Sequence, residues 1–310
     1  MSDGPLPSGI VTPLVAFVTP QGEPDAAAMK ALVDSQVTAG VAAVLINGSM
    51  GEIGLLTPAQ REGLLATVVE AAAGRVSVWC GVGALSTPET AGHAADAGAG
   101  GADAVLALTP LYHELGDLEI RRHYETVAAA SSVPLLAYDI PQRTPRKIPP
   151  AVIAALAADG VLHGVKDSSG DLTQGRVVCL QTADIDGFRC YAGTDLAIDA
   201  VPALGFVGSV PGLANVLPEV AVAIDTAARA GDPITAARQQ RAFLELMTLV
   251  QIPLPGGGPS SVAFDSIKAA TAHVLGLGEP VTLPPLTPPD NAYLAAVSAT
   301  VARARALANP

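Results

Sequence analysis

One stretch, from Val161 to Leu172, decides how the rest of the chain is interpreted, and it reads Val-Leu-His-Gly-Val-Lys-Asp-Ser-Ser-Gly-Asp-Leu. Its apolar start predicts a buried β-strand, and the residues after Lys166 are typical of a turn and a helix start. Lys166 therefore stands where a strand leaves the core. Burial there disfavours the charged ammonium, and an uncharged lysine amine is a nucleophile that condenses with a ketone to give an imine. The alternative interpretation is a surface lysine that merely follows a strand.

The same alternation of apolar run and helical pattern recurs along the chain. Apolar runs predict strands at residues 9–15, 41–46, 76–80, 104–108, 133–138, 161–166, 188–192 and 206–210. Helical patterns follow at residues 25–39, 58–73, from 87, 117–131, 149–158, from 171 and 196–204. Continuously apolar strands indicate a parallel sheet covered by helices, and eight strand–helix repeats are the number that closes a (β/α)8 barrel.

A doubly wound open sheet is the alternative architecture, and it usually shows a glycine-rich turn after its first strand. The residues at that position are Thr12-Pro13-Leu14, so this signal is absent. Beyond Pro218 the strand signals stop, and helices are predicted at residues 219–230, 233–251, 261–275 and 289–307. We therefore predict an α/β protein with a (β/α)8 TIM barrel that carries the active site at residues 1–225. A C-terminal helical region follows at residues 226–310, with a structural or assembly role.

The composition argues against several classes of partner. The 310-residue chain is 50% hydrophobic and has a formal net charge of −12 without a basic run, which disfavours binding to nucleic acid or to an anionic membrane surface. No apolar stretch is long enough to predict a membrane span, and residues 1–8 show no pattern of a signal sequence. The three cysteines lack metal-ligand spacing and favour a reduced, cytoplasmic protein.

Active sites of closed parallel barrels lie at the C-terminal ends of the strands, so the residues that follow the predicted strands are the candidates. They are the turn Gly48–Gly51 with its Ser49, then Tyr112, Tyr138, Arg143 and Lys166. Each has a plainer interpretation, as a tight turn, a core tyrosine, a solvated arginine or a surface lysine. Together they offer an amine, two phenols, a hydroxyl, backbone amides that can bind a carboxylate, and a guanidinium. Chemistry on a keto acid requires such a set.

Three motifs resemble the signatures of the dihydrodipicolinate synthase / N-acetylneuraminate lyase family, and the resemblance is closest to dihydrodipicolinate synthase. The motifs are Gly-Ser-Met-Gly-Glu at 48–52, Tyr-Asp-Ile-Pro-Gln-Arg-Thr at 138–144, and Gly-Val-Lys-Asp-Ser-Ser-Gly-Asp-Leu at 164–172. Members of this family are class I aldolases that form a Schiff base with pyruvate. The resemblance covers nearly the whole chain. It implies pyruvate and an aldehyde or keto acid as substrates, no cofactor and no metal, a homotetramer or homodimer, and a place in lysine biosynthesis.

The resemblance also implies roles for individual residues. Lys166 matches the Schiff-base lysine, and Tyr138 matches the tyrosine whose phenol shuttles protons. Ser49 stands where the family has a threonine or serine that links this tyrosine to a second one. Tyr112 matches the second tyrosine, which in the synthase branch is contributed to the site of a neighbouring subunit.

Substrate-binding roles follow in the same way. The backbone amides of Ser49 and Met50 match those that bind the pyruvate carboxylate, and the Val210 carbonyl matches one that faces the site. Arg143 matches the arginine that, in the synthase branch, binds the carboxylate of the aldehyde. An arginine–carboxylate pair is directional and can be bidentate, which suits it to orienting a substrate.

Departures from the family pattern leave the second substrate open. Met50 replaces a threonine, which removes a hydroxyl and adds apolar bulk, and Asp139 replaces a common asparagine. Polar ligands are missing at most positions that match the lysine-feedback site of the synthase. The alternatives within the family are a 2-keto-3-deoxy sugar acid aldolase or dehydratase, and a hydratase-aldolase that acts on a less polar aldehyde.

Two alternatives come from other functional classes. A keto-acid-binding protein without turnover would be indicated by loss of Lys166 or Tyr138, and both are present. A metal-dependent barrel aldolase needs histidine and carboxylate ligands at strand ends. His113 and Glu114 are the only close pair of this kind there.

Overall fold

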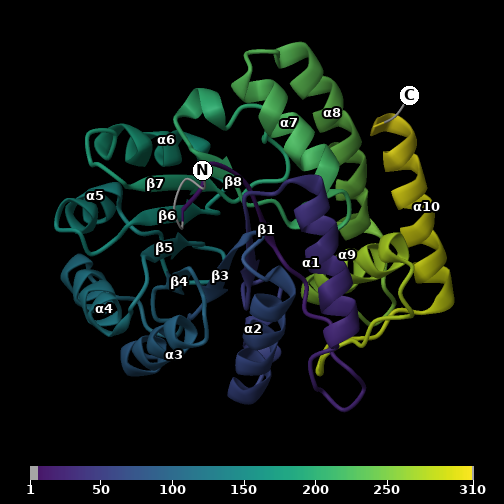
Figure 1. Cartoon of the computed structure of the whole chain (residues 1–310), viewed down its shortest axis with the longest axis horizontal. Coiled ribbons are helices and arrows are strands. Elements are labelled where there is room, and N and C mark those ends of the chain that lie inside the picture. The colour runs from purple at the N-terminus through teal and green to yellow at the C-terminus, as the bar shows by residue number, and fades with distance from the viewer. Residues whose placement is uncertain (1–5, 309–310) are drawn as a thin grey trace.

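A closed barrel of eight parallel strands forms the centre of the computed structural model, which describes residues 6–308 (Figure 1). The strands are β1 (Gly9–Pro13), β2 (Ala43–Ile46), β3 (Ser77–Gly81), β4 (Ala104–Leu108), β5 (Leu135–Asp139), β6 (Gly164–Asp167), β7 (Arg189–Ala192) and β8 (Gly208–Ser209). They are hydrogen-bonded in sequence order, and β1 pairs with β8 to complete the ring. The predicted (β/α)8 barrel is confirmed.

Helices surround the barrel and extend it at the C-terminal end of the chain. Around the barrel lie α1 (Ala26–Ala39), α2 (Pro58–Ala72), α3 (Thr87–Ala99), α4 (Asp117–Ala130), α5 (Pro150–Ala158), α6 (Leu172–Gln181) and α7 (Pro218–Arg229). The predicted C-terminal helical extension is also present, as α8 (Pro233–Leu246), α9 (Pro259–Leu275) and α10 (Asn291–Ala308). Short 3-10 helices lie at η1 (Ile53–Leu55), η2 (Pro202–Leu204), η3 (Gly212–Asn215) and η4 (Met247–Gln251). The division into two regions at residue 225, which falls within α7, stays an interpretation.

The helix predicted at residues 196–204 is wrong, because only the 3-10 turn η2 forms there. Pro202 has no backbone N–H and its ring clashes with the carbonyl four residues earlier. The left-handed Gly205, with φ +94°, then ends the segment. The helix predicted to open at Thr57-Pro58 is confirmed, since Thr57 caps α2 in a capping box with Gln60.

Two layers of side chains make the core, because the strands are buried on both faces. The larger layer lies between the strands and the surrounding helices. The smaller layer fills the barrel interior, where Trp79 and Tyr191 pack edge to face with ring centroids 5.0 Å apart. Tyr138 and Val210 belong to this inner layer. Side chains of successive strand residues point to opposite faces, so Asp139, which follows Tyr138 on β5, faces the helices.

The C-terminal region is tied to the barrel by a buried ion pair. Lys268 on α9 contacts Glu52, which follows the Gly48–Gly51 turn, and the two side chains are 1% and 0% exposed. Burial raises the pKa of Glu52, and the charge and hydrogen bond of Lys268 oppose this effect. In Figure 1, α10 runs beside α8, and α10 also packs on α9. The C-terminal helices therefore reach the turn that carries Ser49.

None of the helices within residues 6–308 is long and apolar enough to cross a membrane. The prediction that residues 1–8 lack a signal sequence falls partly on residues 1–5, which lie outside the described range.

The Glu52–Lys268 pair makes a testable contribution to stability. Lys268→Met should lower the free energy of unfolding by about 3–5 kcal/mol, because it leaves a buried carboxylate without its partner. The double variant Glu52→Gln/Lys268→Met should lose clearly less, because no lone charge stays buried. The measurement is urea denaturation at one fixed protein concentration.

Lys30→Met is the matched control, because the Lys30–Asp34 pair is exposed and such pairs contribute about 0–1 kcal/mol. A double variant that is as unstable as Lys268→Met alone would contradict the prediction.

Candidate active site

Lys166 and Tyr138 lie side by side at the ends of neighbouring strands. The β5–β6 register pairs Tyr138 with Lys166 and, one residue later, Asp139 with Asp167. Lys166 is 4% exposed and Tyr138 is 5% exposed. The Lys166 Nζ lies 4.1 Å from the centroid of the Tyr138 ring. The prediction that Lys166 is buried at the end of a strand is therefore confirmed, and the surface-lysine alternative is wrong.

The Tyr138 hydroxyl has polar partners from two turns. Ser49 Oγ lies 3.4 Å from Tyr138 Oη, and Ser168 and Lys166 also hydrogen-bond the phenol. Burial raises the pKa of Tyr138, but the charge of Lys166 and the hydrogen bonds of Ser49, Lys166 and Ser168 outweigh burial. The pKa of Tyr138 is therefore below its ordinary value. A phenol with a lowered pKa, held by hydrogen-bond partners, is suited to give and take protons.

The turn that carries Ser49 is fixed by its backbone conformation and by a close approach to β3. Asn47 has a left-handed backbone, with φ +55°, and its Nδ2 donates to the Arg61 carbonyl at 2.9 Å. A Cβ at Gly81 would lie 2.1 Å from the Asn47 carbonyl oxygen. Only glycine at position 81 lets the turn pass so close to β3, and this proximity brings Ser49 over the barrel mouth.

The turn that carries Ser168 depends on a second glycine. A Cβ at Gly193, just after β7, would lie 1.8 Å from Ser168 Oγ. The Gly193 N–H donates to the Asp167 carbonyl at 2.7 Å. Glycine at position 193 therefore allows Ser168 to approach Tyr138.

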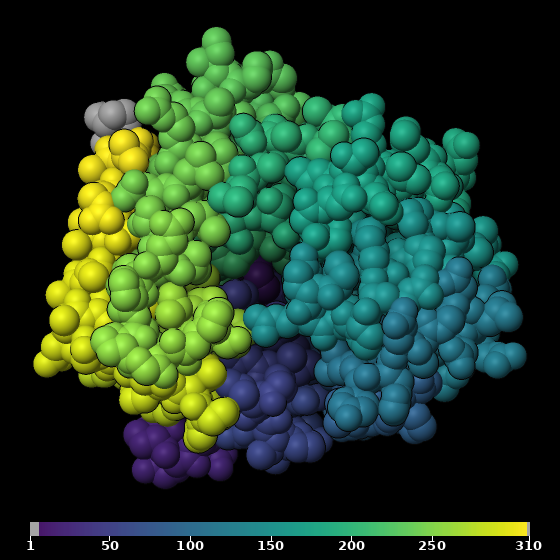
Figure 2. Space-filling view, turned by 180° about the vertical axis from the view of Figure 1, so that it is seen from behind, coloured from purple at the N-terminus to yellow at the C-terminus, as the bar shows by residue number. Residues whose placement is uncertain are grey.

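A cavity of about 300 Å³ opens beside this group, and it is lined by both Ser49 and Arg143. Its other walls are mostly apolar and come partly from the C-terminal region, as Leu108, Leu111, Phe264, Pro285 and Leu286. Figure 2 shows one face hollowed where the yellow-green C-terminal segment meets the teal middle of the chain. The Arg143 guanidinium lies 5.7 Å from the centroid of the Phe264 ring. Arg143 is thus held at the cavity by a cation–π contact with α9.

Two further predicted residues line the barrel mouth. Met50 is half-buried and packs against the core, and its Sδ would lie 3.4 Å from a Cβ at Gly212. Val210 is 4% exposed, belongs to the inner layer of the barrel and donates its N–H to the Ala192 carbonyl at 2.8 Å.

Tyr112 lies apart from the other predicted site residues of its own chain. It lies in the loop after β4, is 82% exposed, and contacts the ring of His113 at a centroid distance of 5.0 Å. Among residues 6–308, the hydroxyls beside Tyr138 belong to Ser49 and Ser168.

Asp195 is a site residue to which the sequence analysis gave no role. Its Oδ1 accepts a hydrogen bond from the Leu213 N–H at 2.8 Å, which joins the turns after β7 and β8. Burial raises the pKa of Asp195 to about 6, although the Leu213 and Gly212 N–H groups and the charge of Lys166 oppose this shift. Its position directly after a predicted strand was the available signal.

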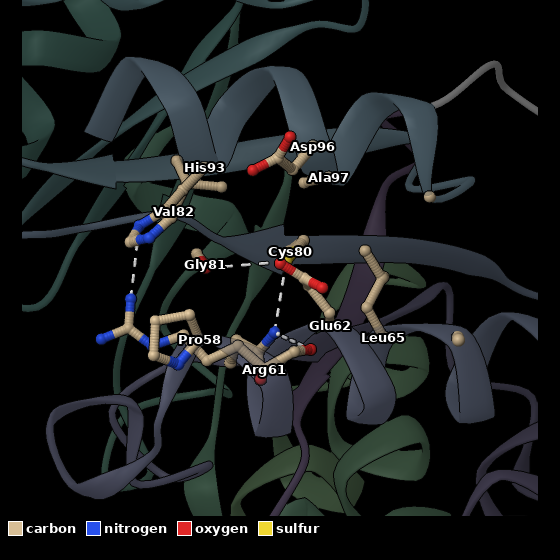
Figure 3. Close-up of a pocket in the computed structure, with 13 residues that line it drawn as sticks. Pro58, Arg61, Glu62, Leu65, Cys80, Gly81, Val82, His93, Asp96 and Ala97 are labelled. Carbon is tan, nitrogen blue, oxygen red and sulfur yellow. Dashed lines mark hydrogen bonds between the residues drawn. The ribbon is translucent and has the colours of Figure 1, made fainter. Parts of the chain in front are cut away.

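A second cavity, of about 90 Å³, lies between α2, β3 and α3, outside the Ser49–Arg143 cavity (Figure 3). Arg61 crosses it, with Nη1 3.3 Å from His93 Nδ1 and Nη2 donating to the Ile53 carbonyl at 2.9 Å. Burial lowers the pKa of Arg61, and the charges of Glu89 and Cys80 oppose the shift. Arg61 therefore fixes α2 against α3 and the Ile53 turn.

Sequence comparison places this geometry in a known family. The model of the dihydrodipicolinate synthetase family matches residues 6–304. The chain belongs to this family. A 4-hydroxy-tetrahydrodipicolinate synthase from Hyphomonas neptunium is 33% identical over 291 residues, which cover 93% of this chain and 96% of the relative. An uncharacterised DapA-like lyase from Halobacterium salinarum is 36% identical over 239 residues, which are 77% of each chain. The predicted family is therefore confirmed.

Solved structures of dihydrodipicolinate synthetase family members share the fold along nearly the whole chain. YagE, a prophage protein of the family from E. coli K12 solved in complex with pyruvate, has a TM-score of 0.86 and 26% identity, over 96% of this chain and 98% of YagE. A dihydrodipicolinate synthase from Bacteroides thetaiotaomicron has a TM-score of 0.88 and 25% identity, over 95% of this chain and 98% of that one.

The sequence predicts that L-lysine does not inhibit this family member at the position of the synthase feedback site. At the positions that the family resemblance implies for this site stand Ile53, Gly54, Pro58, Arg61, Leu85 and Leu111, and the resemblance implies that only Glu89 is kept. Arg61 is already engaged with His93 and Ile53. The initial rate should therefore be the same with and without millimolar L-lysine, and saturable inhibition by L-lysine would contradict this prediction.

Proposed function

We propose that the chain is a Schiff-base-forming, pyruvate-dependent synthase of the 4-hydroxy-tetrahydrodipicolinate type, which condenses pyruvate with L-aspartate semialdehyde. The observation that carries the proposal is the buried Lys166 amine, 4.1 Å from the ring of a tyrosine at the mouth of a closed barrel. Family membership and curated relatives named as 4-hydroxy-tetrahydrodipicolinate synthases support it.

The chemistry follows from the amine and the phenol. The uncharged Lys166 amine adds to the C2 carbonyl of pyruvate, and loss of water from the carbinolamine gives a protonated imine. The imine withdraws electrons, so a methyl proton of pyruvate leaves and an enamine forms. The enamine carbon then attacks the aldehyde carbon, and water releases the product from Lys166. Tyr138 gives and takes the protons of these steps, while Ser49 and Ser168 orient its hydroxyl.

The Ser49–Arg143 cavity and the barrel mouth beside it supply the binding groups in this proposal. The backbone amides of Ser49 and Met50 bind the pyruvate carboxylate, and the Val210 carbonyl faces the imine. Arg143 binds the carboxylate of the aldehyde, and its contact with Phe264 limits the directions in which it can point.

Assembly and compartment are part of the same proposal. Because Tyr112 is exposed, we infer that it reaches Tyr138 of a neighbouring subunit through Ser49, in a homotetramer or homodimer. The buried free thiols of Cys80, Cys179 and Cys190 favour a reducing compartment, so we place the enzyme in the cytoplasm, within lysine biosynthesis.

One observation favours a second candidate function. The walls of the Ser49–Arg143 cavity are mostly apolar side chains, and Met50 adds further apolar bulk at the barrel mouth. A hydratase-aldolase or a sugar acid aldolase of the same family, acting on a less polar aldehyde, would use this surface. The imine chemistry on Lys166 is common to both candidates.

Borohydride trapping tests the shared chemistry. Reduction in the presence of pyruvate should attach one pyruvate-derived group to Lys166, and peptide mass mapping can assign it because the chain has only four lysines. Lys166→Ala should give no adduct, and Lys30→Ala, which removes an exposed lysine, should react like the wild type. Tyr138→Phe should slow adduct formation about 100-fold or more. An adduct on another lysine, or one that persists in Lys166→Ala, would disprove the proposal.

A panel of aldehydes separates the two candidates. Aspartate semialdehyde should give the highest kcat/KM, and Arg143→Gln should lower that value about 10- to 100-fold, since a charge-assisted hydrogen bond is lost. The same variant should leave pyruvate trapping unchanged. Met50→Thr should favour the polar substrate. Failure with aspartate semialdehyde together with turnover of an apolar aldehyde would select the second candidate.

A further inference from the structure

A buried ionic cluster lies directly behind the Lys166–Tyr138 pair, and the proposed function assigns it no role. Lys147 Nζ donates to Asp139 Oδ2 at 2.6 Å, to Asp167 Oδ2 at 3.2 Å and to Ser169 Oγ at 2.9 Å. The Asp139 and Asp167 side chains are 1% and 7% exposed, and that of Lys147 is 22% exposed. Asp139 follows Tyr138 on β5, and Asp167 follows Lys166 on β6. Each carboxylate therefore faces outward where its neighbour faces the barrel interior.

The Lys147 ammonium joins four segments that build the site. It links the ends of β5 and β6 and the turn that contains Ser168 and Ser169, and it comes from the loop that carries Arg143. Both carboxylates are also bound by backbone, since Ile148 N donates to Asp139 Oδ1 at 3.1 Å and Ser169 N donates to Asp167 Oδ1 at 2.8 Å. Removing Lys147 would therefore loosen the register that places Lys166 against Tyr138.

The charged side chains of the cluster also shift one another's pKa values. Burial lowers the pKa of Lys147, but hydrogen bonds and attraction from Asp139 and Asp167 outweigh burial, so its pKa is above the ordinary value. Burial raises the pKa of Asp139, and Lys147 opposes this shift. Paired in register on adjacent strands, the two carboxylates would repel each other without the ammonium.

Other titratable groups surround the cluster and Lys166. Tyr138 and Asp195 are the groups whose charges interact with Lys166 from β5 and from the turn after β7. The charge of Asp139 or Asp167 also acts to raise the pKa of three groups on the surrounding elements. These are Tyr124 on α4, Cys179 on α6 and Cys190 on β7. Within residues 6–308, Lys147 is the one cation that forms ion pairs with both Asp139 and Asp167.

We propose that Lys147 is a positioning residue for the imine-forming pair. It holds the ends of β5 and β6 so that Lys166 lies against Tyr138, and it offsets the charge of two carboxylates that would otherwise favour the Lys166 ammonium over the reactive amine. This inference rests on the proposed function, because it concerns the state in which Lys166 attacks pyruvate.

Competitive labelling of the full chain with trace acetic anhydride, from pH 6 to pH 10, tests the proposal without any substrate. Peptide mass analysis follows Lys166 against Lys30, which is 64% exposed and serves as the internal reference amine. The variants are Lys147→Met, Lys147→Arg and Asp139→Asn/Lys147→Met. The formal charge of the cluster is −1 in the wild type, −2 in Lys147→Met and −1 again in the double variant.

The reactivity midpoint of Lys166 should rise by about one pH unit in Lys147→Met, which is about tenfold lower reactivity at neutral pH. Lys147→Arg should keep the wild-type midpoint, and the double variant should return towards it. If Lys147 had a purely structural role, the double variant would not regain the wild-type midpoint of Lys166. An unchanged midpoint in Lys147→Met, or a double variant that matches Lys147→Met, would overturn the proposal.

Asp139→Asn alone should shift the reactivity midpoint of Lys166 in the opposite direction. This variant keeps the test decisive if Lys147→Met does not fold. It removes one negative charge, so the Lys166 midpoint should fall, and a rise would overturn the proposal. The failure of the proposed function can be told apart from the failure of this inference. If the proposed function is wrong, wild-type Lys166 will react with acetic anhydride in a pH-dependent way but will form no adduct with pyruvate. Failure of the Lys147 inference alone would show as normal adduct formation with a midpoint insensitive to the cluster's charge.

Discussion

The contact between the Lys166 amine and the Tyr138 ring is the constraint on which the rest of the site depends. It requires two neighbouring parallel strands in one register, with both side chains turned into a packed barrel interior. If either strand slipped by one residue, its site side chain would turn outward and leave its partner. The ring closure of eight strands and the backbone of Gly81 and Gly193 hold this register and bring the Ser49 and Ser168 turns to the phenol.

The C-terminal helices contribute to the site as well as to the fold. Through Lys268, α9 holds Glu52 at the end of the Ser49 turn, and through Phe264 it holds Arg143 at the cavity. One helix therefore contacts both of the elements proposed to bind the two substrates. These contacts link the stability of the C-terminal region to the geometry of the barrel mouth.

Sequence patterns predicted the barrel, the order of its elements and the burial of Lys166, because apolar runs and helix caps are local signals. The helix predicted at residues 196–204 does not form, because Pro202 outweighs an otherwise helical composition. The partners of Asp139 and Arg143 could not be predicted. Lys147 and Phe264 meet them only in the folded chain, and neither pairing leaves a spacing pattern. Asp195 stood after a predicted strand, but its role in joining two turns depends on the closed ring.

The most direct test of the central claim is a crystal structure of the protein soaked with pyruvate. We expect continuous electron density between Lys166 Nζ and C2 of pyruvate, with Tyr138 Oη beside the new bond and the carboxylate on the Ser49–Met50 turn. Pyruvate bound without a covalent bond to Lys166, or bound to another lysine, would contradict it.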